Sequence, residues 1–134
     1  LVTLLLSLIG IGVSTYLTIE HYDTSLTLSC PANGTINCLQ VTSSTYSKLA
    51  GVPVALLGLL FFVALAATFL PPLSRWAYMD EARFAAASVG TLFVLYLVWA
   101  ELFRIDAICL WCTGVHVLTL VLLGTTSWTV GQRR

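Results

Sequence analysis

Residues 108–130 read ICLWCTGVHVLTLVLLGTTSWTV, an apolar run that opens on two cysteines and contains no Asp, Glu, Lys or Arg. A run of about 20 such residues is long enough to cross the hydrocarbon core of a bilayer as an α-helix. The two cysteines, Cys109 and Cys112, stand three residues apart near the start of the run. The stretch therefore predicts a transmembrane helix that carries a thiol pair at one end.

Three further apolar runs have lengths that fit a bilayer, at residues 1–22, 53–70 and 84–103. Of the 134 residues, 58% are hydrophobic and only 9% are charged, whereas soluble domains carry about 25% charged residues. So few charges cannot cover a surface that faces water. The net charge is zero and no long basic run is present, so no nucleic-acid partner is expected.

The sequence thus predicts an all-α membrane protein, a four-transmembrane-helix bundle that forms a single domain over residues 1–134. A long, polar, Ser/Thr-rich loop is expected between helices 1 and 2, on the extracytoplasmic side. Within this loop, residues 38–49 place apolar side chains at roughly helical spacing and predict a short helix over the bundle. Membrane lipid is the surrounding medium of such a protein.

The basic residues predict which side of the membrane the thiols face. With four spans, both termini and the 71–83 link share one side, which holds four Arg, while the other side holds Lys48 and Arg104. Because basic residues favour the cytoplasmic side, the termini are expected there. Cys30 and Cys38 in the long loop then lie with the Cys-x-x-Cys pair on the extracytoplasmic, oxidising side.

Two thiols in Cys-x-x-Cys spacing at a helix start are typical of a redox pair. Residues three apart on a helix lie within disulfide reach, and the free N–H groups at a helix N-terminus stabilise a thiolate. Cys30 and Cys38 form a second pair, and the Asn33-Gly34 turn between them makes a loop disulfide easy to close. Two neighbouring pairs can exchange electrons by thiol–disulfide exchange. A static structural disulfide is the alternative for either pair, and two buried thiols that only pack are a further alternative for Cys109 and Cys112.

Other cysteine chemistry fits these positions poorly. Zinc sites use closely spaced ligands, whereas Cys30 and Cys38 are far apart and no nearby His completes a set. A c-type haem site needs His directly after the second cysteine of Cys-x-x-Cys, and Thr113 stands there. No metal is expected.

The order and spacing of these residues resemble the vitamin K epoxide reductase family, and in particular its bacterial members. The matching positions are Cys30-x7-Cys38, Ser43-Ser44, Gly51-Val52-Pro53, Gly58 and Cys109-x2-Cys112. The loop pair comes first and the membrane pair second, which distinguishes this pattern from the other quinone-linked family of disulfide-forming proteins.

The resemblance implies a membrane thiol–disulfide oxidoreductase that supports disulfide bond formation. Such an enzyme reoxidises an extracytoplasmic thioredoxin-like or DsbA-like thiol protein and passes the electrons through two cysteine pairs to a quinone of the ubiquinone, menaquinone or vitamin K type. The resemblance places it in the bacterial cytoplasmic (inner) membrane as a multi-pass protein whose active cysteines face the extracytoplasmic side.

The resemblance also implies a role for each matched residue. Cys30 resembles the cysteine attacked by the partner, and Cys38 the shuttle that passes electrons inward. Cys109 resembles the acceptor of those electrons, and Cys112 the cysteine that faces the quinone. Ser44 matches a family serine near the quinone ring, although a hydroxyl in this Ser/Thr-rich segment fits a helix cap equally well.

His116 and Glu101 are ionisable residues inside the predicted spans. His116 follows Cys112 by one helical turn on the same face, at a position where animal members of the family often have Tyr. We expect it to contact the quinone; a neutral His bonded to a neighbouring helix is the alternative. Glu101 is expected to reach the membrane interface or to pair with Arg104, with a proton-relay role as the alternative.

Two other functions fit parts of the sequence. A tetraspan structural or adhesion protein of the claudin-like kind would also carry a disulfide in its first loop, but it has no use for a second pair at a helix mouth. Vitamin K epoxide reduction proper would use the same site and differ only in substrate.

Overall fold

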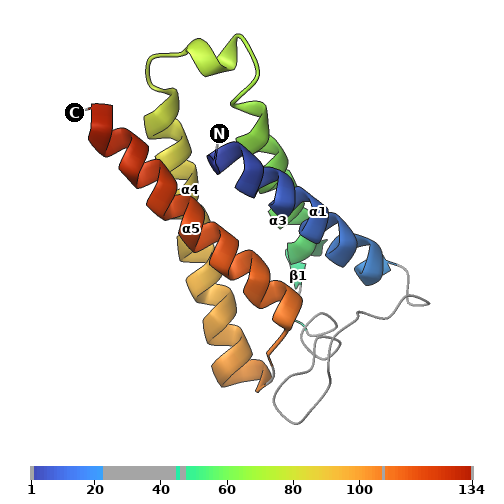
Figure 1. The fold of residues 1–134 in the computed structure, drawn as a ribbon. Helices are drawn as coiled ribbons and strands as arrows, with labels where there is room; N and C mark the ends of the chain where they lie inside the picture. The colour runs from blue at the N-terminus through green and yellow to red at the C-terminus, as the bar shows by residue number, and fades with distance from the viewer. Residues whose placement is uncertain (1, 23–44, 46–47, 107, 134) are drawn as a thin grey trace.

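The computed structural model describes residues 2–22, 45, 48–106 and 108–133. Helices account for most of these residues (Figure 1): α1 Val2–Tyr22, α3 Val54–Ala67, η2 Leu73–Arg75, α4 Met79–Trp99, η3 Ala100–Ile105 and α5 Leu110–Arg133. A short antiparallel hairpin, β1 Lys48–Leu49 with β2 Val52–Pro53, leads directly into α3.

Three of the helices are long and apolar enough to cross a membrane: α1, α4 with its extension to Ile105, and α5. These helices confirm the prediction of a helical membrane bundle. The fourth apolar helix, α3, has only 14 residues. At 1.5 Å per residue it is about 21 Å long, against a hydrocarbon core of about 30 Å.

The helix α3 is shorter than the predicted span over 53–70 because the chain turns before the apolar run ends. Thr68 closes the last turn, where its N–H and its Oγ1 both donate to the carbonyl of Leu65, at 3.2 and 2.6 Å. Pro71 follows, and proline has no N–H with which to continue a helix.

The helix α4 extends beyond the predicted span over 84–103 at both ends. It begins at Met79, because Asp80 and Glu81 occupy its first turn, where acidic side chains suit the helix dipole. At its other end the chain continues as the π-helix η3 to Ile105. Apolar length alone detects neither a polar first turn nor a change of helix type.

The predicted long loop falls mainly on residues 23–44 and 46–47, which lie outside the described residues. The short helix predicted over 38–49 is wrong at its C-terminal end. There Lys48 and Leu49 form β1 and pair with Pro53 and Val52.

The helices form two packed pairs, α1 with α3 and α4 with α5, and α1 also packs on α5. Figure 1 shows the termini and the link between α3 and α4 at one end of the bundle, and the hairpin with the start of α5 at the other. The Cys-x-x-Cys pair therefore lies at the end opposite the termini.

The contact between α1 and α3 depends on a glycine. A Cβ atom added at Gly10 would lie 2.4 Å from the ring of Phe62, far inside van der Waals contact. Phe62 is fully buried and forms the core together with Leu65 and Leu122. Small residues at such contacts let membrane helices approach closely.

Charged side chains join three helices at the end where the termini lie. Arg83 donates from Nε and Nη2 to Oγ1 and O of Thr68 (2.8 and 2.7 Å) and from Nη1 to Asp80 Oδ1 (2.8 Å). Arg133 places Nε 2.6 Å from Asp80 Oδ2. We call Thr68, Asp80, Arg83 and Arg133 the arginine clasp; it ties the end of α3 to α4 and α5.

Candidate functional site: a thiol pair beside an apolar cavity

Cys109 caps the N-terminus of α5 with its sulfur. The N–H of Cys112 donates to Cys109 Sγ at 3.3 Å, and the N–H of Thr113 donates to the Cys109 carbonyl at 2.8 Å. This is the position at which a Ser or Asp side chain usually accepts from the third helical residue. The side chain of Cys112 also hydrogen-bonds the sulfur, and this bond lowers the pKa of the Cys109 thiol despite its burial. A lowered pKa favours the thiolate form of Cys109.

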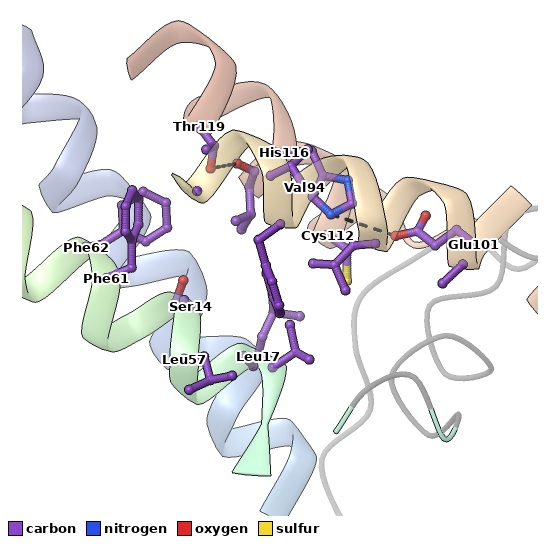
Figure 2. A pocket seen from close by; sticks show the side chains of 18 of the residues that line it. Ser14, Leu17, Leu57, Phe61, Phe62, Val94, Glu101, Cys112, His116 and Thr119 are labelled. Carbon is purple, nitrogen blue, oxygen red and sulfur yellow. Dashed lines mark hydrogen bonds and ion pairs between the residues drawn. The ribbon is translucent and has the colours of Figure 1, made fainter. Parts of the chain in front are cut away.

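A cavity of about 300 Å³ lies between the helices beside Cys112 (Figure 2). Side chains from α1, α3, α4 and α5 line it, and most of them are apolar. Its lining residues with polar side chains are Ser14, His21, Glu101, Cys112, His116 and Thr119. An apolar pocket of this size with a few convergent polar groups is typical of a small-molecule site.

Cys112 and His116 both line this cavity from α5, one helical turn apart. Figure 2 shows them near Glu101, across the cavity from Phe61 and Phe62 of α3. Cys109 is completely buried and is not among the lining residues. The two thiols therefore differ in access, since only Cys112 meets the cavity.

Glu101 lies inside the bundle, so the prediction that it reaches the membrane interface is wrong. The residue is 6% exposed, and its Oε1 lies 3.9 Å from Nε2 of His116. Its carboxylate also accepts a hydrogen bond from the backbone of Cys109. Glu101 thus contacts Cys109, directly before α5, and also lines the cavity.

The sequence contains a pattern that could have placed Glu101 inward. Asp80, Ala87, Val94 and Glu101 recur every seven residues along α4 and η3, and all four are buried. A seven-residue interval brings side chains back to nearly the same face of a helix.

Sequence reasoning also missed Gly90, which lines the cavity from α4. A Cβ added there would lie 3.0 Å from the Phe61 ring and 3.3 Å from the Thr119 methyl group. The absence of a side chain at Gly90 therefore lets both residues reach the cavity wall. A glycine in an apolar helix is the pattern that marks such close approach.

The structure brings together three of the predicted site residues, Cys109, Cys112 and His116. The other three, Cys30, Cys38 and Ser44, lie outside the described residues. Their roles stay predictions.

Comparison with known families decides the classification. The profile described as the vitamin K epoxide reductase family matches residues 1–127, which include both cysteine pairs. The chain belongs to the vitamin K epoxide reductase family. Membership confirms the resemblance drawn from the cysteine and serine spacing, and it makes the protein a multi-pass membrane oxidoreductase. The bacterial origin stays a prediction.

In this vitamin K epoxide reductase family member, the thiol pair and the apolar cavity lie at the same end of the bundle. The pair can carry two electrons, and the cavity can hold an apolar electron acceptor against one of the two sulfurs.

Proposed function

We propose that this protein oxidises an extracytoplasmic thioredoxin-like thiol protein and reduces a quinone in the membrane. The observation that carries the proposal is that Cys112, one thiol of a Cys-x-x-Cys pair, lines an apolar cavity inside a membrane bundle. The family membership supports redox chemistry at this pair.

The residues of the cavity fit a quinone headgroup. A quinone is a planar apolar ring with two carbonyl oxygens, which are hydrogen-bond acceptors. The apolar walls from α3 and α4 suit the ring, and the His116 imidazole can donate to a carbonyl oxygen. A quinone also partitions into the bilayer, where this bundle lies.

The electrons balance over three exchanges. Two thiols of the partner reduce a Cys30–Cys38 disulfide and become a disulfide themselves. The Cys30–Cys38 dithiol then reduces a Cys109–Cys112 disulfide. In the last step, the Cys109–Cys112 dithiol gives two electrons and two protons to the quinone, which yields a disulfide and a hydroquinone.

The transfer between the pairs predicts a Cys38–Cys109 mixed disulfide, because electrons can cross between pairs only through a bond between them. The double variant Cys30→Ser, Cys112→Ser removes the resolving partner of each thiol. It should accumulate the Cys38–Cys109 bond, detected by non-reducing peptide mapping. Recovery of both thiols in the free state after mild oxidation would contradict the relay.

Turnover by the purified protein in lipid nanodiscs tests the whole function. With a reduced thioredoxin-like protein and a short-chain ubiquinone or menaquinone, the loss of quinone absorbance should be catalytic. Cys112→Ser should abolish it with any reductant. Cys30→Ser, the same chemical change at the other pair, should lose turnover with the protein partner but keep it with dithiothreitol. Quinone reduction by Cys112→Ser at the native rate would refute the proposal.

The family description also favours vitamin K epoxide as a second substrate of the same site. The same nanodisc assay with vitamin K epoxide in place of the quinone separates the two functions. Catalytic loss of the epoxide, with the quinone left oxidised, would make epoxide reduction the principal activity.

A further inference from the structure

We propose that Glu101 holds the proton of Cys109 while the thiol pair is reduced and returns it through His116 to a carbonyl oxygen of the quinone. This inference rests on the proposed function. It gives Glu101 a role in proton transfer, and it assigns the proton donation at the quinone to His116.

The proton of Cys109 needs a route because Cys109 does not reach the cavity. When the dithiol becomes a disulfide, both sulfurs must lose their protons, and the quinone must gain two. Cys112 lines the cavity and can pass its proton directly to the bound ring. Cys109 is fully buried and does not line the cavity, so its proton needs an intermediate group.

Among the residues that the structure describes, Glu101 is the ionisable one that contacts both Cys109 and the cavity. Its carboxylate accepts a hydrogen bond from the Cys109 backbone, and it also lines the cavity. Its Oε1 lies 3.9 Å from His116 Nε2, and both side chains are more than nine-tenths buried. This distance is too long for a hydrogen bond, but pairs of this kind often tighten only when substrate is bound.

The charges around the thiol pair favour a proton on Glu101 while Cys109 is a thiolate. The helix N-terminus and the Cys112 N–H stabilise a thiolate at Cys109. A second negative charge at Glu101 would repel that thiolate, so a protonated Glu101 beside it is the favourable arrangement. The net charge of the Cys109–Glu101 unit stays at minus one while the proton moves.

Few other titratable groups face this region among residues 2–22, 45, 48–106 and 108–133. From α1, His21 lines the cavity and the charge of Glu20 acts on Cys112. The lining residues of α3 are all apolar or Gly, and Glu101 is the only titratable one from α4 and η3. His116 lies 3.9 Å from Glu101 and lines the cavity, so it is the group to which Glu101 can pass the proton.

The protons and electrons balance along this route. Two electrons leave the sulfurs as the S–S bond forms and reduce the quinone to the hydroquinone. One proton comes from Cys112, and the other passes from Cys109 to Glu101, then to His116, then to the quinone oxygen. Glu101 and His116 each gain and lose one proton, and no further oxidant or reductant is required.

Single-turnover quinone reduction by the pre-reduced protein in nanodiscs tests the relay. Glu101→Gln should slow the reaction by about a hundredfold or more, the usual contribution of a positioned acid–base group. The quinone concentration that gives half the maximal single-turnover rate should change little. Glu101→Asp should recover part of the rate, because it keeps the carboxyl group. Glu81→Gln makes the same change at the opposite end of α4 and should react like wild type.

The infrared difference spectrum of the wild-type protein, reduced minus oxidised, tests the relay even if Glu101→Gln folds poorly. It should contain the C=O band of a protonated carboxyl group, and Glu81→Gln should keep this band. A spectrum without the band would overturn the relay, as would a native rate for Glu101→Gln. In both cases, quinone reduction by the wild type leaves the proposed function standing. If the wild type does not reduce quinone at all, both proposals fail.

Discussion

The continuous helix formed by α4 and η3 has a buried carboxylate near each end, Asp80 and Glu101, and the two differ in their ion-pair partners. At the terminal end, Asp80 has Arg83 at 2.8 Å and Arg133 at 2.6 Å. At the cysteine end, Glu101 has His116 at 3.9 Å, beside a cavity. Asp80 is held by short ion pairs, whereas Glu101 has a distant partner and lies beside space for a ligand.

The difference separates a structural role from a functional one. Removing one partner of a tightly paired buried charge costs stability because the other charge is left uncompensated. A loosely paired acid and base beside a cavity contribute less to stability and can exchange protons with a substrate. Variants at the arginine clasp should therefore change stability, and variants at the cysteine end should change chemistry.

Arg83→Gln should have the largest effect on stability. It removes the ion pair with Asp80 and the hydrogen bonds to Thr68, and we expect it to lower the free energy of unfolding by about 3 kcal/mol. Tryptophan fluorescence during thermal unfolding in detergent measures this. Arg75→Gln, at an exposed position, is the matched control and should unfold like wild type.

Quinone reduction by the folded fraction of Arg83→Gln should stay at the native rate. A native midpoint together with slower quinone reduction would reverse the assignment of the two ends.

Gly10→Ala should have the next largest effect, because the added methyl group would overlap the Phe62 ring. Overpacking of this kind costs about 2 kcal/mol. Gly12→Ala on the same helix meets open space and should gain roughly 0.5–1 kcal/mol, since Ala is the better helix former. The same unfolding measurement compares the two variants, and equal midpoints would mean that α1 and α3 do not pack as described.

His116→Phe should have the smallest effect on stability and should change the reaction with quinone instead. The variant keeps a ring but removes a hydrogen bond worth about 0.5–1.5 kcal/mol, so the KM for quinone should rise about two- to twelvefold. Because Phe cannot carry a proton, the rate of quinone reduction should also fall about as far as in Glu101→Gln. Steady-state turnover with dithiothreitol measures the KM. An unchanged KM with a lower unfolding midpoint would identify His116 as a structural residue.

The local features of the sequence predicted much of the fold and part of the site. Apolar run length detected all four helices, and the i to i+4 spacing placed Cys112 and His116 on one face. The end of α3 was predicted less well, because the turn at Thr68 interrupts an apolar run that continues to Leu70.

Glu101 could not be placed correctly from its distance to the end of the run. Its environment depends on η3, where the backbone changes from α- to π-helical hydrogen bonding. Its contact with Cys109 joins two segments across the turn that ends η3 at Asp106. Such contacts follow from tertiary structure and not from apolar periodicity.

The most direct test of the account uses a protein in which only the Cys109–Cys112 pair remains. The variant Cys30→Ser, Cys38→Ser is reduced with dithiothreitol, freed of reductant, and mixed anaerobically with quinone in nanodiscs. The account predicts about one hydroquinone per protein, together with the loss of both free thiols. Quinone that stays oxidised while both thiols stay free would contradict electron transfer from this pair to a quinone.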